Sequence, residues 1–259
     1  MSIDAEVVQI RKELATHILP TIQLAPSLER PEHPWSSKFG GLPYWPKSMS
    51  YPESDCGFKL ILLAQLNFSE LPELEGFPKK GLLQFFILDD GLYGADFSKP
   101  AEEVIAASSG YRVVYHSEII EDESALETKL PVASQTKMFP LSEQYSLTGS
   151  LEKELPSATD YRFEQAASNP MEYEKEVTEY IYDHFISAGS KIGGYANFTQ
   201  QDPRHGSKDE WLLLFQMDSE VIGNSHIMWG DMGIGSFFIK KEALEMKDFS
   251  KVWYSWDCG

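Results

Sequence analysis

GLLQFFI at residues 81–87 and GIGSFFI at residues 233–239 are the stretches that decide the fold. Each begins with a glycine. Successive side chains of a strand point to opposite faces of the sheet, and in both stretches apolar side chains fall on both faces. A strand that is apolar on both faces is covered on both faces. Because aromatic and β-branched residues favour sheets, both stretches are predicted to be buried strands of a β-rich core.

The likeness between these stretches extends outward along the chain. Three further blocks recur in the same order, 151 to 153 residues later: SKFGG at 37–41 as SKIGG at 190–194, LLAQLN at 62–67 as LLFQMD at 213–218, and DFSK at 96–99 as DFSK at 248–251. Four blocks in one order at nearly one spacing predict an internal duplication.

The duplication predicts how the chain is organised. We expect one compact domain over residues 1–259, with copy one at about 35–118, an acidic helical insert at about 119–187 and copy two at about 188–257. Two copies are too few for an open solenoid, so they are expected to pair around a local two-fold axis.

The predicted fold class is α+β: a duplicated β-rich unit with mainly antiparallel sheets and peripheral helices. Apolar residues at helical spacing predict a helix over 3–18, ended by Pro20, and a second helix over 172–187. The strands expected in copy one are 58–68, 82–88 and 111–119. Six prolines between them and the first helix, at 26–52, predict an ordered irregular loop because proline cannot donate to a ladder.

The charge of the chain narrows the classes of partner. The net charge is −18, from 40 acidic and 22 basic residues. This field disfavours nucleic acid and an anionic membrane surface, and it attracts a basic protein partner or a cationic ligand. Solubility alone is the plainer explanation. Two cysteines without a framework and an N-terminus without an apolar run indicate the cytoplasm.

Several common chemistries leave no trace in the sequence. The chain lacks the G-x-S-x-G elbow of α/β-hydrolases, the P-loop and the dinucleotide fingerprint. Its 6 histidines form no H-E-x-x-H pair. We therefore predict no cofactor and no metal site, and leave open whether the protein is an enzyme.

Polar residues in or beside the repeated blocks are the candidate ligand-binding residues: Lys38, Gln65, Lys191, Gln216, Trp229 and Asp231. The two lysines precede Gly-Gly pairs and could hold an anion or lie at the surface. The two glutamines either tie a loop to a strand end or line a groove between the copies. A Trp beside an Asp in a glycine-rich turn suits a cation, or else the Trp packs and the Asp caps the turn.

KFGGLPY at 38–44, the blocks at 62–67 and 81–87, and MWGDMG at 228–233 resemble the YwqG-like family of bacterial proteins. The resemblance covers about residues 35–257. It implies a domain of unknown function and carries over no catalytic residue.

The sequence thus favours a non-catalytic binding or interaction protein of the cytoplasm with a basic protein partner. The alternative is an enzyme or small-ligand-binding protein with a site in the cleft between the copies, using Asp231 or Asp257 with a lysine. A structural subunit of a larger assembly is the third hypothesis, and the oligomeric state is open.

Overall fold

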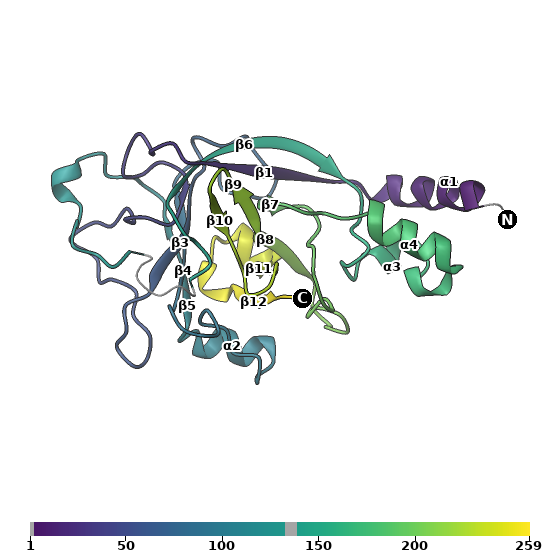
Figure 1. Cartoon of the computed structure of the whole chain (residues 1–259). Coiled ribbons are helices and arrows are strands. Elements are labelled where there is room, and N and C mark those ends of the chain that lie inside the picture. The colour runs from purple at the N-terminus through teal and green to yellow at the C-terminus, as the bar shows by residue number, and fades with distance from the viewer. Residues whose placement is uncertain (1–2, 133–138) are drawn as a thin grey trace.

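The computed structural model describes residues 3–132 and 139–259, and most of its strands form one ten-stranded sheet (Figure 1). All neighbours in the sheet are antiparallel. From edge to edge the strands are β12 (Trp253–Asp257), β11 (Ile234–Lys240), β8 (Trp211–Asp218), β7 (Lys191–Gly193), β1 (Leu19–Ser27), β6 (Tyr145–Glu154), β2 (Lys38–Phe39), β3 (Ile61–Asn67), β4 (Leu82–Ile87) and β5 (Tyr111–His116). A separate hairpin pairs β9 (Glu220–Ile222) with β10 (Ser225–Ile227).

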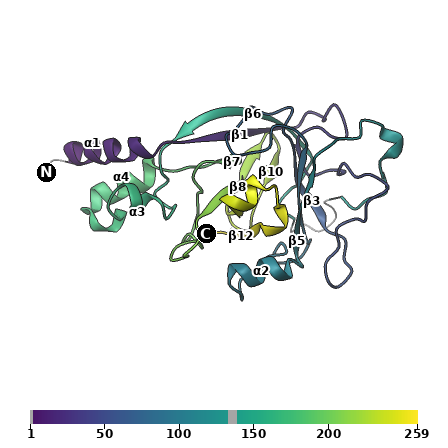
Figure 2. The same ribbon diagram turned by 180° about the vertical axis from the view of Figure 1, so that it is seen from behind.

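The sheet folds over so that its two ends face each other. Both views show β3, β4 and β5 as one wall, β1 and β6 crossing above, and β8, β11 and β12 opposite the wall (Figures 1 and 2). Phe85 of β4 meets Phe215 of β8 and Phe237 of β11 at ring-centroid distances of 4.6 and 4.8 Å. The main hydrophobic core therefore lies between the two ends of one sheet.

The helices lie outside this core. They are α1 (Ile3–Leu14), α2 (Ala101–Ala107), α3 (Phe163–Ala166), α4 (Lys175–His184) and α5 (Lys241–Glu245). α1 buries Ile10 and Leu14 against Val177 and Ile181 of α4, which forms a second, smaller core away from the sheet. In the part of the chain that the structure describes, no helix is long and apolar enough to cross a bilayer.

The main strands of the first half match the sequence prediction. β3, β4 and β5 lie within the stretches 58–68, 82–88 and 111–119, and every residue of β3 and β4 is buried. Burial on both faces follows from their place in the wall, with the core on one side and the loop 40–52 on the other. The fold is therefore a β-rich α+β fold with mainly antiparallel pairing, as predicted.

The acidic segment 119–187 differs from its prediction as a peripheral helical insert. It contains α3 and α4, but also β6, a ten-residue strand in the middle of the sheet. Strand β6 buries Tyr145 and Leu147 but leaves most of its SLEKE end exposed or half-exposed, so charge there costs little desolvation. The charge pattern indicated solvent contact, which a half-covered strand provides as well as a helix does.

The prediction that Pro20 ends the first helix is also corrected. The helix ends at Leu14, a 3-10 turn follows, and Pro20 and Pro26 both lie inside β1. β1 pairs with β6 along its length but with β7 only at residues 21–23. The prolines fall outside the doubly paired part, where a missing N–H removes no central ladder bond.

Candidate functional site

The two predicted glutamines are internal ties between a strand and a loop. Gln65 Oε1 accepts from the Tyr44 amide at 2.9 Å, and its Nε2 donates to the carbonyls of Pro34 and Ser36 at 2.9 and 2.8 Å. Gln216 accepts from the Asn197 amide at 2.8 Å and donates to the carbonyls of Ser187 and Gly189 at 3.1 and 2.9 Å. Both side chains are fully buried, which favours the tie over the groove-lining alternative.

The two predicted lysines are buried beside these glutamines. Lys38 pairs in register with Gln65, and Lys191 with Gln216. Lys38 Nζ donates to the carbonyls of Pro34 and Leu42 at 3.1 and 2.7 Å, and burial lowers its pKa to about 8. Lys191 Nζ lies 2.9 Å from Glu154 Oε2; burial lowers its pKa and the Glu154 carboxylate opposes that shift. Both ammonium groups are thus engaged inside the protein.

Trp229 and Asp231 lie apart from these pairs and differ from each other. Trp229 is fully buried against Tyr93 and Trp256, at ring-centroid distances of 5.3 and 6.3 Å. Asp231 is exposed, and its carbonyl accepts from the Gly259 amide. The structure therefore places the Trp in a packing position and the Asp on the surface.

A small cavity lies where the two halves of the chain meet. Its volume is about 140 Å³. The first half contributes Phe97, and the second half contributes β11, β12 and the loop that follows β7; the lining residues used below are Phe97, Phe198, Gln200, Ser236 and Asp257. Neither predicted lysine is among its described lining residues. It is the one place where both halves and unpaired polar atoms come together among the described hollows.

Asp257, the last residue of β12, is only half satisfied. Its Oδ2 accepts from the amides of Thr199 and Gln200 at 2.8 and 2.7 Å, whereas Oδ1 is buried with no partner among the described residues. Burial raises the pKa of this carboxyl, and hydrogen bonding from Gln200, Thr199 and the Asp257 amide opposes the shift. A carboxylate oxygen without a partner, on a residue that lines a cavity, is suited to accept from a cationic group.

Ser236, in the neighbouring strand β11, also has a buried side-chain oxygen without a partner among the residues that the structure describes. Its side chain is 2% exposed and its Oγ finds no partner in the described chain. The β11–β12 register pairs Ile234 with Asp257 and Ser236 with Ser255, so Ser236 and Asp257 lie on the same face of the sheet. A buried polar atom without a partner costs about 1–3 kcal/mol, which a ligand at this face would recover.

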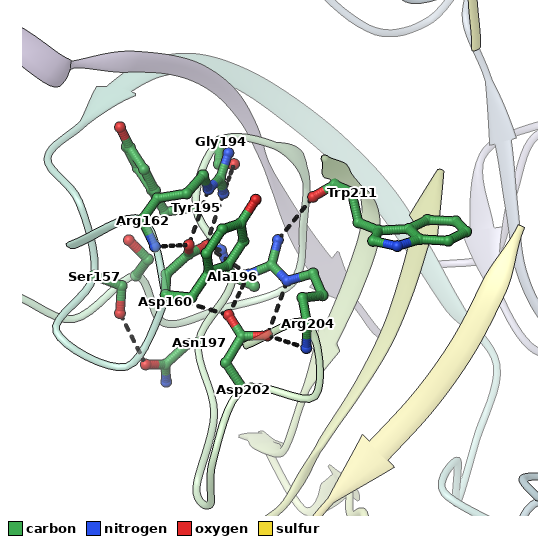
Figure 3. A network of polar contacts seen from close by, with 12 residues as sticks. Ser157, Asp160, Arg162, Gly194, Tyr195, Ala196, Asn197, Asp202, Arg204 and Trp211 are labelled. Carbon is green, nitrogen blue, oxygen red and sulfur yellow. Dashed lines mark hydrogen bonds and ion pairs between the residues drawn. The ribbon is translucent and has the colours of Figure 1, made fainter. Parts of the chain in front are cut away.

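A buried charge cluster holds the loop 196–204, which contributes lining residues to the cavity (Figure 3). Arg204 Nη2 lies 2.8 Å from Asp160 Oδ2 and 2.7 Å from Asp202 Oδ2, and Arg162 Nη2 lies 2.7 Å from the same Asp160 oxygen. Burial raises the pKa of Asp160, but the two guanidinium groups outweigh it and hold that pKa well below its usual range. Because the Ala196 amide also donates to Asp160 at 2.9 Å, the cluster fixes both ends of the loop 196–204.

Two larger hollows adjoin the small cavity. One, of about 390 Å³, shares Gln200 and Gln201 with it, and the other, of about 410 Å³, shares Phe97 and Pro203. His205 lines both larger hollows. Residues of the loop 196–204 line all three hollows.

Sequence reasoning named Asp257 only as part of an enzyme hypothesis and overlooked Ser236. A signal for Ser236 was present: SFF at 236–238 aligns with QFF at 84–86, with a short hydroxyl in place of a long amide. Nothing local in the sequence brings Phe97 to Asp257, because 160 residues separate them.

The fold and the cavity define a class: an antiparallel β-sheet protein whose sheet closes over one core and which has a small cavity on the other face of β11 and β12. The chain belongs to the family described as Domain of unknown function (DUF1963), whose family model matches residues 37–258. The match includes every lining residue of the small cavity and excludes α1 and β1. A comparison with curated proteins finds no match.

Proposed function

We propose that the protein is a non-catalytic binding protein of the cytoplasm, built from two copies of one β-rich unit, that takes a basic protein partner at the small cavity where Phe97 of copy one meets copy two. The single observation that carries this function is the buried, unpaired Oδ1 of Asp257, a residue that lines this cavity. A net charge of −18 would steer a basic partner towards the molecule, and the carboxylate gives one cationic side chain a fixed place to bind.

Matching contacts support two copies. Gln65 forms hydrogen bonds with Pro34, Ser36 and Tyr44. Gln216 forms hydrogen bonds with Ser187, Gly189 and Asn197. Each partner of Gln216 lies 153 residues after the corresponding partner of Gln65. The β3–β4 pair and the β8–β11 pair each have a register shift at one residue. This residue is Leu63 in the first pair and Leu214 in the second. Read outward from the central pair, the strands run β6-β2-β3-β4-β5 one way and β1-β7-β8-β11-β12 the other.

The motifs at 38–44 and 228–233 further support a YwqG-like, bacterial member of the family. On this proposal Trp229 shapes the cavity from behind, through Trp256, and does not touch the partner.

The test measures the affinity of a lysine- and arginine-rich peptide for the full chain by calorimetry, at a series of salt concentrations. Asp257→Asn keeps the shape of the side chain but removes its charge, and we expect about tenfold weaker binding, or about 1.4 kcal/mol. Asp231→Asn makes the same charge change at an exposed position outside the cavity and is expected to change affinity less than twofold.

The pH dependence should follow Asp257. A cation binds the ionised carboxylate, so affinity falls as the pH drops through the raised pKa of Asp257, and Asp257→Asn removes that dependence. Asp218 couples to this carboxyl and burial raises its pKa as well, but Asp218 is unchanged in the variant, so the part of the dependence that the variant loses belongs to Asp257. No binding at low salt would refute the function, and equal losses in both variants would place the partner on the general surface.

A further inference from the structure

The small cavity coincides with a position that is filled in the first half of the molecule. Gln84 pairs in register with Gln65 as Ser236 pairs with Gln216. His116 pairs with Leu82, the first residue of β4, as Asp257 pairs with Ile234, the first residue of β11. The couple Gln84–His116 therefore corresponds in register to the couple Ser236–Asp257.

In the first half this couple is complete. Gln84 Nε2 donates to the Tyr44 carbonyl and to Gln65 Oε1, both at 2.8 Å, and Gln84 Oε1 lies 2.8 Å from His116 Nε2. The planar amide thus places two N–H groups against two acceptors. All of these groups are buried, and the side chains fill the space between strand and loop.

In the second half the planar donor is missing. Serine is too short to reach where the Gln84 amide lies, and Asp257 supplies an acceptor where His116 supplies a ring nitrogen. Ser236 Oγ and Asp257 Oδ1 remain without partners among the described residues. Gln216 Oε1 accepts from the Asn197 amide, whereas Gln65 Oε1 accepts from both Tyr44 and Gln84. What the site lacks is a planar group that carries several N–H donors.

We infer that the cavity between β11, β12 and Phe97 is a guanidinium pocket, which takes the side chain of an arginine. This deepens the proposed function, on which it rests, by naming the partner residue. A guanidinium is planar, carries five N–H donors and stacks on aromatic rings, here Phe97 and Phe198, whereas an ammonium is strongly hydrated and directs its donors in three dimensions. One N–H edge serves Asp257 Oδ1 and another serves Ser236 Oγ.

The experiment compares methylguanidinium with methylammonium on the full chain, by chemical-shift titration of the Ser236 and Asp257 amides. We expect methylguanidinium to bind at least about tenfold more tightly. The double variant S236Q/D257H installs the residues of the first half, so it should fill the pocket and abolish methylguanidinium binding while the unfolding temperature is kept or raised. If that variant does not fold, S236Q alone fills the amide position and carries the same expectation.

Equal affinity for the two cations would overturn the inference, and so would undiminished methylguanidinium binding in S236Q. The outcomes separate this inference from the proposed function. A basic peptide that binds S236Q as tightly as the natural protein removes the guanidinium pocket but leaves a basic partner. Methylguanidinium binding without peptide binding keeps the pocket and removes the protein partner.

Discussion

At the scale of single residues, buried polar groups decide what each half of the molecule can do. The orientation of the Gln84 amide determines the tautomer of His116: because Gln84 Nε2 donates elsewhere, its Oε1 is an acceptor and His116 Nε2 must carry the proton. Burial lowers the pKa of His116 to about 4. The imidazole is therefore neutral in the folded protein at neutral pH and serves as a structural donor.

This shift makes stability depend on pH. In the unfolded chain the histidine takes up a proton near its ordinary pKa of 6.5, whereas folded His116 does so only near pH 4. The unfolded state binds more protons between these values, so the contribution is complete above pH 6.5 and is lost as the pH falls towards 4, by up to about 3 kcal/mol.

Urea unfolding of the natural protein and of His116→Gln at pH 7 and pH 5 measures this contribution. We expect the free energy of unfolding to fall less on acidification in His116→Gln. Exposed His17→Gln removes another imidazole outside the core and should behave as the natural protein does. The same acid sensitivity in His116→Gln would show that the loss arises at other groups.

At the scale of elements, the Gly-Gly turns after β2 and β7 fix how each strand enters the sheet. Gly40, Gly41, Gly193 and Gly194 all have φ between +63° and +71°, which side chains rarely adopt. A Cβ at Gly41 would overlap the Gln144 side chain, and one at Gly194 would overlap Glu154 Oε1. The turn thus keeps Glu154 in place to pair with Lys191 and to accept from the Tyr195 amide.

Gly194→Ala tests this double requirement. Left-handed backbone alone costs alanine about 1 kcal/mol, and displacement of Glu154 leaves the buried Lys191 ammonium unpaired, so we expect a total loss above about 3 kcal/mol. Gly206→Ala is the matched control, since its φ is +80° and a Cβ there meets nothing within 4 Å. Chemical unfolding of both variants measures the difference, and equal losses would mean that only backbone strain matters.

At the scale of the whole molecule, the sheet makes the two halves interdependent. β1 and β6 pair over nine residues at its centre, and the ring of Phe85 contacts those of Phe215 and Phe237 across the core. Tyr111 also donates to the Val252 carbonyl, and Tyr254 to the Tyr93 carbonyl, so the outer strands are linked in both directions. Neither half can bury its aromatic face without the other.

We therefore expect Phe85→Ala to destabilise both ends of the sheet together, by about 3–5 kcal/mol, because it opens a cavity between them. Native-state hydrogen exchange should show protection lost to the same extent in β4 and β11. Phe58→Ala, at a side chain that is 64% exposed, is expected to stay within about 0.5 kcal/mol of the natural protein. Loss confined to β4 would show that the halves unfold separately.

The sequence by itself determined the strands of the wall and the turns beside them. Those features depend on local rules: two-face apolar runs at 81–87 and 233–239 require burial, and paired glycines require positive φ. The repeat also indicated which glutamine corresponds to which. Only the tertiary structure decided that β1 and β6, with their prolines and charges, occupy the centre of the sheet.

The same holds for the site. Loops from distant parts of the chain decide which buried polar atoms find partners. Phe97 lines the same cavity as Asp257, and the loop 196–204 lies beside β12. The composition of the chain and the spacing of its motifs do not indicate which distant segments lie side by side. Polar satisfaction is a property of the packed molecule, so the cavity became visible only once Phe97 and the loop 196–204 were placed beside β11 and β12.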